Sequence, residues 1–264
     1  MIDSHCHIGF DELKDNVADI VERASKAGIE KILTVGCGEE HLSDLYHVLD
    51  KFDNVYGAFG IHPNEAQEVI SVQKLRQLIQ SHPKIIAVGE TGLDYYYNET
   101  PKEIQIQNFM MHIEVASELN LPLIVHTRDA EKDTIEALRA GCSKGALKGV
   151  LHCFTGTKRL ANAAQELGFY LSASGIITFK KNPNNEKYQT DLQDTFASYP
   201  TELLLVETDS PYLAPVPMRG KTNEPAYLPY TLAKLAELKV KTVDEMDAIT
   251  TQNFYNLFFK GQNQ

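Results

Sequence analysis

The chain has 264 residues, a formal net charge of −11 at pH 7 and 43% hydrophobic residues. This length exceeds the usual domain of roughly 100–200 residues, but single α/β barrels reach about 250 residues, so one large domain is compatible with it. The negative charge argues against a protein that coats nucleic acid with a generally basic surface, although bound divalent metals can create a local cationic site in an acidic protein.

Localisation and domain organisation follow from what the sequence lacks. No apolar run approaches the roughly 20 residues of a membrane span, and the first residues lack the basic and hydrophobic segments of a signal peptide, so we expect a cytoplasmic protein without a membrane partner. No linker or low-complexity tract interrupts the chain, which predicts a single domain over residues 1–264. The cysteines form no C-x-x-C pair and are expected to be reduced, small apolar side chains. They are Cys6, Cys37, Cys142 and Cys153.

Eight short runs rich in β-forming residues alternate with longer segments of helical periodicity. The predicted strands cover residues 1–8, 31–36, 55–60, 85–90, 121–126, 148–153, 168–173 and 203–208. Apolar residues recur every three or four positions in 13–27 and 104–119, which predicts helices. Strand followed by helix, repeated eight times, is the pattern of a parallel (β/α)8 TIM barrel, so the predicted fold class is α/β. Thr242 and Glu245 have the spacing of a capping box and predict a final helix.

Residues that commonly bind metals lie at the ends of these predicted strands, where barrel enzymes build their active sites. Side chains alternate along a strand, so His5 and His7 should face one side and Cys6 the other. The same alternation separates His152 from Cys153, whose thiol should pack against the helical layer. The candidate ligands at strand ends are His5, His7, Glu90, His126, His152 and Asp209, and His62 follows the third strand.

A metal centre explains these residues better than separate structural roles do. One buried histidine is usually a hydrogen-bonded core residue, and one carboxylate at a strand end often caps a helix. Six such residues together would bury several ionisable groups, which costs free energy unless a cation compensates. The remaining histidines fall on helical or connecting segments and are expected to converge on nothing. These are His41, His47, His82 and His112.

An ordered series of motifs runs through the whole chain. The motifs are DSHCH (3–7), GIHP (60–63), GETGLDYY (89–96), VHTRDA (125–130), LHCFTG (151–156), ETDSPYL (207–213), RGKTNEPA (219–226) and TTQNFYNLF (250–258). With this series the chain resembles the TatD family of metal-dependent deoxyribonucleases, within the amidohydrolase-like hydrolases. Asn64 stands where many family members have histidine, and the loop 95–100 is locally variable, so the resemblance does not define the substrate contacts there.

The resemblance implies a binuclear site at the C-terminal face with two divalent ions, which could be Mg, Mn or Zn. In this arrangement His5, His7 and Asp209 hold one ion. His126 and His152 hold the other, and Glu90 bridges them. Two ions can activate a water for phosphodiester displacement, and Asp209 could also accept its proton, so Glu90 and Asp209 are the predicted catalytic residues.

Four residues on proposed loops of the C-terminal face are expected to bind substrate phosphate: His62, Arg128, Arg219 and Lys221. The fork of an arginine guanidinium suits phosphate oxygens, although Arg128 could instead pair with a nearby carboxylate. Lys180 and Lys181 lie after the seventh strand. The tyrosines at 95–97 could stack on bases or simply pack over the rim.

Three functions remain open at this stage. The resemblance implies a 3′–5′ exonuclease whose partner is DNA, chiefly single-stranded ends. A binuclear hydrolase of an amide, ester or acyl-nucleic acid is the second, but many related amidohydrolases bridge their ions with a carboxylated lysine, and here Glu90 takes that place. The third is a non-catalytic metal-stabilised binding protein, which six N/O ligands disfavour because structural zinc sites are closed by four N/S ligands. The oligomeric state is not defined by the sequence.

Overall fold

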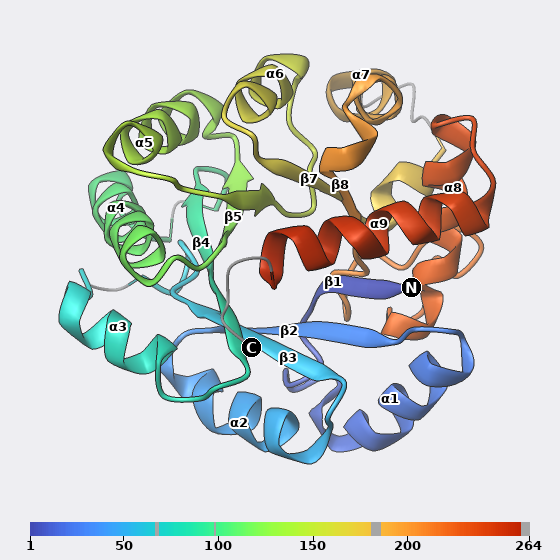
Figure 1. Cartoon of the computed structure of the whole chain (residues 1–264), viewed down its shortest axis with the longest axis horizontal. Coiled ribbons are helices and arrows are strands. Elements are labelled where there is room, and N and C mark those ends of the chain that lie inside the picture. The colour runs from blue at the N-terminus through green and yellow to red at the C-terminus, as the bar shows by residue number, and fades with distance from the viewer. Residues whose placement is uncertain (67–68, 98, 181–185, 260–264) are drawn as a thin grey trace.

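A computed structural model describes residues 1–66, 69–97, 99–180 and 186–259. Its strands run in parallel and pair in chain order to form one eight-stranded sheet (Figure 1). They are β1 (Ile2–Cys6), β2 (Lys31–Cys37), β3 (Val55–Gly60), β4 (Ile85–Asp94), β5 (Leu123–Arg128), β6 (Gly149–Leu151), β7 (Tyr170–Ala173) and β8 (Leu204–Val206).

Helices follow the strands and surround the sheet, which confirms the predicted (β/α)8 barrel (Figure 1). They are α1 (Val17–Lys26), α2 (Leu42–Lys51), α3 (Val72–Ile79), α4 (Lys102–Leu119), α5 (Glu131–Lys144), α6 (Lys158–Glu166), α7 (Glu186–Ser198), α8 (Leu228–Leu238) and α9 (Val243–Phe258). Short 3-10 helices cover Lys14–Asn16, Glu39–His41, Gly175–Thr178, Thr201–Leu203 and Pro225–Tyr227. Within the described residues, no helix is long and apolar enough to cross a membrane.

The barrel closes between its first and last strands. The backbone N–H of Asp209 donates to the carbonyl of His5 (3.0 Å), and the N–H of His7 donates to the carbonyl of Ser210 (2.7 Å). The hydroxyl of Ser4 also donates to the carbonyl of Val206 (2.9 Å). These bonds bring residues from opposite ends of the chain to the same point on the C-terminal rim.

Alternation along the strands divides the core into an interior and an outer layer. On β2, Leu33 and Val35 belong to the barrel interior, whereas Ile32 packs in the layer between the strands and helices. Phe254 and Phe258 of α9 join the interior cluster, so α9 covers the N-terminal end of the barrel, where it crosses the strands in Figure 1. The opposite end is therefore left for a functional site.

The capping box of α9 is confirmed. The Thr242 hydroxyl accepts from the Glu245 backbone N–H (3.2 Å), and the Glu245 carboxylate accepts from the Thr242 backbone N–H (2.8 Å). Two backbone donors at the start of the helix are thereby satisfied.

Several predicted strand boundaries were wrong at the C-terminal rim. β4 continues to Asp94 and β5 to Arg128, because the two strands stay paired as far as these residues after a register shift between Val88 and Thr91. β1 ends at Cys6, so His7 follows the strand. β6 ends at Leu151, before His152 and Cys153.

Candidate metal centre

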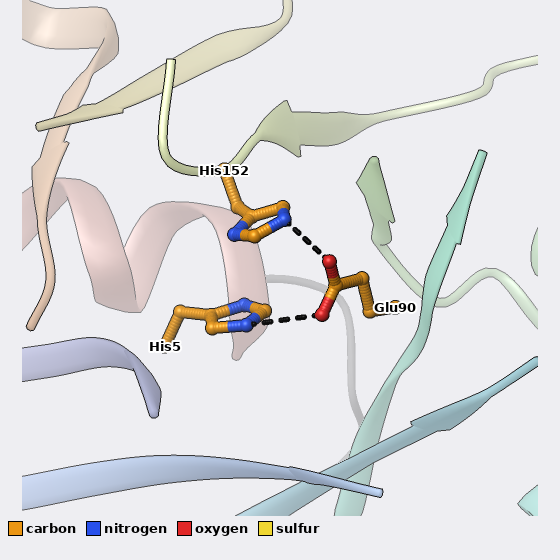
Figure 2. Close-up of side chains that lie close together, drawn as sticks. All are labelled: His5, Glu90 and His152. Carbon is orange, nitrogen blue, oxygen red and sulfur yellow. Dashed lines mark ion pairs between the residues drawn. The ribbon is translucent and has the colours of Figure 1, made fainter. Parts of the chain in front are cut away.

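Histidines from four other segments of the rim contact the Glu90 carboxylate. Its Oε1 atom lies 2.7 Å from His152 Nε2 and 3.0 Å from His126 Nδ1. Its Oε2 atom lies 3.3 Å from His5 Nε2. Figure 2 shows the carboxylate facing both the His5 and the His152 ring. Glu90 is buried, so this carboxylate depends on its neighbours to balance its charge.

A second carboxylate, Asp209, faces the two N-terminal histidines. Its Oδ1 atom lies 3.5 Å from His7 Nε2 and 3.8 Å from His5 Nε2. The two histidines face the same side, as alternation predicts, while the Cys6 thiol points to the Leu33 carbonyl at 3.6 Å. Asp209 follows β8 with φ of 56°, a left-handed conformation that aspartate tolerates better than most residues. The turn after β8 thus directs its side chain toward His5 and His7.

The predicted ligands are packed as donors around a cation would be. His5 Nε2 lies 3.1 Å from His7 Nε2, and His152 Nε2 lies 3.4 Å from His126 Nδ1. Two imidazole lone pairs cannot face each other favourably, so a cation or a proton is needed between them. The nitrogen and oxygen donors fit a divalent ion such as zinc or manganese.

Among the residues that the structure describes, four groups of three side chains have ligand atoms close enough to share an ion. The groups are His5–His7–Asp209, His5–Glu90–His152, His62–Glu90–His126 and His7–Cys37–Glu90. The first coincides with the set predicted for one ion. His126 and His152 fall into different groups that share Glu90, and His62 joins one of them. The division of ligands between two ions therefore remains a prediction.

Contacts behind the cluster orient the histidine rings. His126 Nε2 lies 3.0 Å from Asp94 Oδ2, which leaves Nδ1 facing Glu90. His152 Nδ1 lies 3.6 Å from Glu207 Oε1, a distance for an ion pair but not for a hydrogen bond. Carboxylates placed behind histidine ligands commonly fix the ring and raise its basicity. Neither carboxylate was predicted as part of the site from the sequence, although Asp94 ends β4 and Glu207 follows β8.

The electrostatics of the cluster favour positive charge beside Glu90. Burial alone would raise the pKa of Glu90, but the charges of His152 and His62 and hydrogen bonds from His126 and His152 hold it well below its usual value. Burial disfavours protonation of His152, yet the charge of Glu90 and contacts with Glu207 raise its pKa well above the usual value. A divalent cation would supply the same compensation.

His62 and His112 lie closer to the centre than their sequence positions suggest. His62 Nε2 is 3.5 Å from Glu90 Oε1, and burial lowers the pKa of His62 to about 3. His62 was predicted to contact substrate and also has the position of a ligand. His112 was expected to converge on nothing, but its Nε2 atom accepts the Ile61 backbone N–H at 3.0 Å. Buried His112 on α4 therefore holds the segment that presents His62.

Gly92 allows β4 to approach β5 beside His126. Its φ is 142°, and a Cβ atom at this position would lie 2.0 Å from the His126 carbonyl oxygen. A larger residue would therefore force the two strands apart. The close approach keeps His126 facing Glu90.

The remaining predicted substrate residues have different environments. Arg128 ends β5 with its guanidinium over the Tyr96 ring, 3.7 Å from the centroid. No ion pair between described residues gives Arg128 the carboxylate partner of the alternative interpretation. Arg219 packs over the Phe179 ring at 3.9 Å. Lys221 is exposed in the connection between β8 and α8. No contact between described residues joins Arg219 or Lys221 to the metal cluster.

Two further expectations concern the sixth and seventh strands. Cys153 does not follow strand alternation, because it lies after β6 with φ of 41°. Its thiol is 3.2 Å from the Ser174 hydroxyl, so the expected packing against the helical layer was wrong. Lys180 is exposed beyond β7, and Lys181 lies outside the described residues.

Known proteins similar to this chain match it over nearly its whole length. The TatD related DNase family profile matches residues 2–259. The uncharacterized metal-dependent hydrolase YcfH of Escherichia coli (strain K12) is 41% identical over 268 residues, covering 98% of this chain and 95% of that protein. A protein of Escherichia fergusonii named 3'-5' ssDNA/RNA exonuclease TatD is 31% identical over 246 residues, covering 91% and 92%. The crystal structure of YJJV, a TatD homolog from Escherichia coli K12, has a TM-score of 0.88 at 28% identity and covers 98% of this chain and 97% of its own.

The barrel and its cluster of histidines and carboxylates at the C-terminal rim define the class of metal-dependent hydrolases. Within that class, the family match over nearly the whole chain decides the assignment. The chain belongs to the TatD family.

Proposed function

We propose that this protein is a metal-dependent deoxyribonuclease that hydrolyses DNA phosphodiester bonds as a 3′–5′ exonuclease on single-stranded ends. The observation that carries the proposal is the position of Glu90 among histidines of several strands, with Arg128 on the same rim and without a carboxylate partner among the described residues. The exonuclease name of the Escherichia fergusonii relative supports the direction of attack and the single-stranded substrate.

Two divalent ions, Mg, Mn or Zn, would activate a water and offset the charge that develops on the phosphate. His5, His7 and Asp209 would hold one of them. His126 and His152 would hold the other, and Glu90 would contact both. This donor set leaves room for water and a substrate oxygen, as a catalytic site requires.

The chain's own residues have three further tasks in this proposal. Asp209 accepts a proton from the attacking water, for which its carboxylate is placed beside His5 and His7. His62 lies beside Glu90 and binds the reacting phosphate. Arg128 lies at the same rim and binds another phosphate of the DNA substrate. Arg219 and Lys221 lie on the connection after β8 and would contact the DNA farther from the reacting phosphate.

The proposal is tested by a substrate panel after metal removal and reloading. We expect protein reloaded with Mg, Mn or Zn to cleave single-stranded DNA in preference to p-nitrophenyl esters and amides. Glu90→Gln and Asp209→Asn should each lower the rate by about 10²–10⁴-fold, because each removes a group from the reacting site. Asp133→Asn is the matched control, since Asp133 contacts the Tyr95 hydroxyl (2.7 Å) and not the cluster.

The same panel distinguishes the alternative function. Efficient ester or amide hydrolysis with no cleavage of nucleic acid would replace the nuclease with a binuclear hydrolase of acyl substrates. Full DNA cleavage by Glu90→Gln would show that the reaction takes place elsewhere. Thermal unfolding of each variant checks that the barrel is intact.

A further inference from the structure

Two exposed tyrosines and a half-buried arginine form a cluster beside the metal centre, which we call the aromatic rim (Tyr96, Tyr97 and Arg128). Tyr96 and Tyr97 are each 54% exposed, an unusual exposure for two adjacent aromatic residues. Their ring centroids are 4.9 Å apart with an interplanar angle of 89°. The Arg128 guanidinium carbon lies 3.7 Å from one centroid and 4.9 Å from the other.

Arg128 is oriented without being neutralised. None of the ion pairs or hydrogen bonds between described residues gives its guanidinium a carboxylate, and the rings cover its face instead. Stacking uses the face of a guanidinium, so its N–H donors remain available in the plane of the group. An arginine held in this way is suited to a phosphate, whose oxygens match that fork.

The aromatic rim is attached to the metal centre through one buried carboxylate. Asp94 Oδ1 accepts the backbone N–H of Tyr96 at 2.9 Å and that of Tyr97 at 3.4 Å. Asp94 Oδ2 lies 3.0 Å from His126 Nε2. On β5, His126 and Arg128 are two residues apart and so face the same side, separated by roughly 7 Å along the strand. This distance is about the spacing between neighbouring phosphates in a strand.

We propose that the aromatic rim is a nucleotide-binding subsite, in which Arg128 binds the phosphate next to the one that is cleaved and Tyr96 or Tyr97 stacks on an unpaired base. This inference rests on the proposed function and specifies its substrate. A base within a duplex is already stacked on its neighbours, so the rim selects unpaired ends. Small esters and amides have neither the second phosphate nor the base, and they gain nothing from the rim.

Binding of labelled single strands tests the subsite without cleavage. Fluorescence anisotropy in EDTA compares two oligonucleotides that differ only at the last two 3′ positions, which carry normal bases in one and abasic sugars in the other. The double variant Tyr96→Leu, Tyr97→Leu should raise the Kd about tenfold for the normal strand and less than threefold for the abasic strand, since one stacked base contributes about tenfold or more.

Two further variants separate stacking from phosphate binding. Arg128→Gln should raise the Kd of both strands by the same factor, because both keep their phosphates. Tyr230→Leu is the matched control, an exposed tyrosine on α8 whose replacement should change neither Kd. If the tyrosine variant also misplaces Arg128, binding of both oligonucleotides weakens by the same factor. The additional weakening seen only with the normal oligonucleotide then measures the stacking contribution.

The subsite is overturned if the tyrosine variant weakens both strands equally, or if it changes neither. Cleavage of the normal strand by metal-loaded wild-type protein is measured separately. Base-dependent binding without any cleavage would refute the proposed nuclease and leave the subsite in place. Cleavage without base-dependent binding would refute the subsite alone.

Discussion

Replacing Asp94 with asparagine tests how the barrel orients a metal ligand. Asp94 is buried, and its Oδ2 atom lies 3.0 Å from His126 Nε2. Burial would raise the pKa of Asp94, but hydrogen bonding and charge from His126, with the backbone N–H groups of Tyr96 and Tyr97, lower it to about 2, so the group is an anion at neutral pH. Asparagine keeps the shape and removes the charge.

Loss of a carboxylate behind a histidine ligand typically lowers metal affinity about 10–100-fold, or about 1.4–2.7 kcal/mol. We expect Asp94→Asn to lower zinc affinity by a factor in this range. The assay is competition between the metal-free protein and a chromogenic chelator of known affinity. Asp133→Asn on α5 should bind zinc like the wild type, because its partner is Tyr95. Equal affinities in wild type and Asp94→Asn would refute the assigned role of Asp94.

Three further predictions concern stability and strand geometry. Burial lowers the pKa of His112 to about 4, although its hydrogen bond to Asn108 opposes this shift. Between pH 6.5 and pH 4, His112 is therefore protonated in the unfolded chain but stays neutral in the folded chain. In denaturant titrations, the free energy of unfolding of the wild type should therefore fall by up to about 3 kcal/mol between pH 6.5 and pH 4. His112→Gln should lack this contribution. Identical pH profiles for wild type and variant would disprove the role of His112. Thr242→Ala should lower the free energy of unfolding in urea by about 0.5–2 kcal/mol, and Thr242→Ser should lower it less. An unchanged free energy of unfolding in the alanine variant would mean that the capping box does not stabilise the protein. Gly92→Ala should lower both the melting temperature and the zinc affinity, because the added Cβ meets the His126 carbonyl. Gly168→Ala is the control, since open space surrounds that position and its zinc affinity should stay unchanged. Equal zinc affinities in the two variants would argue against the close approach of β4 and β5.

The barrel was predictable because its signal is repeated. Apolar strands and amphipathic helices alternate eight times along the chain. A parallel sheet covered by the connecting helices buries both the strands and the apolar faces of the helices. That arrangement places strand ends on one rim, so His5 and Glu90 could be expected near each other despite their separation in sequence. Alternation also gave the correct side for His5 and His7, although His7 lies one residue beyond the end of β1.

Alternation failed where the backbone leaves the strand. Cys153 follows the end of β6 with a positive φ, a conformation that no two-residue period encodes. The extension of β4 to Asp94 depends on pairing with β5 after a register shift, which is a tertiary effect. Asp94 was therefore missed, and with it the link between His126 and the aromatic rim.

His112 shows a different limit of sequence reasoning. It lies on a helix far along the chain from the residues it supports, and only packing of α4 against the barrel brings its ring to the Ile61 backbone. No spacing of residues in the sequence identifies a histidine whose role is to hold a loop in place. The environment of Arg128 was equally inaccessible, since its stacking depends on how the loop after β4 folds over β5.

The most direct test of the account follows one labelled single-stranded DNA over time. The oligonucleotide carries a fluorophore at its 5′ end, and the protein is stripped with EDTA, reloaded with a divalent metal and checked for two ions per chain. We predict progressively shorter labelled products from the 3′ end, no products before reloading, and a rate about 10²–10⁴-fold lower with Glu90→Gln. Labelled mononucleotide as the first product, or an intact strand after incubation with fully loaded protein, would contradict it.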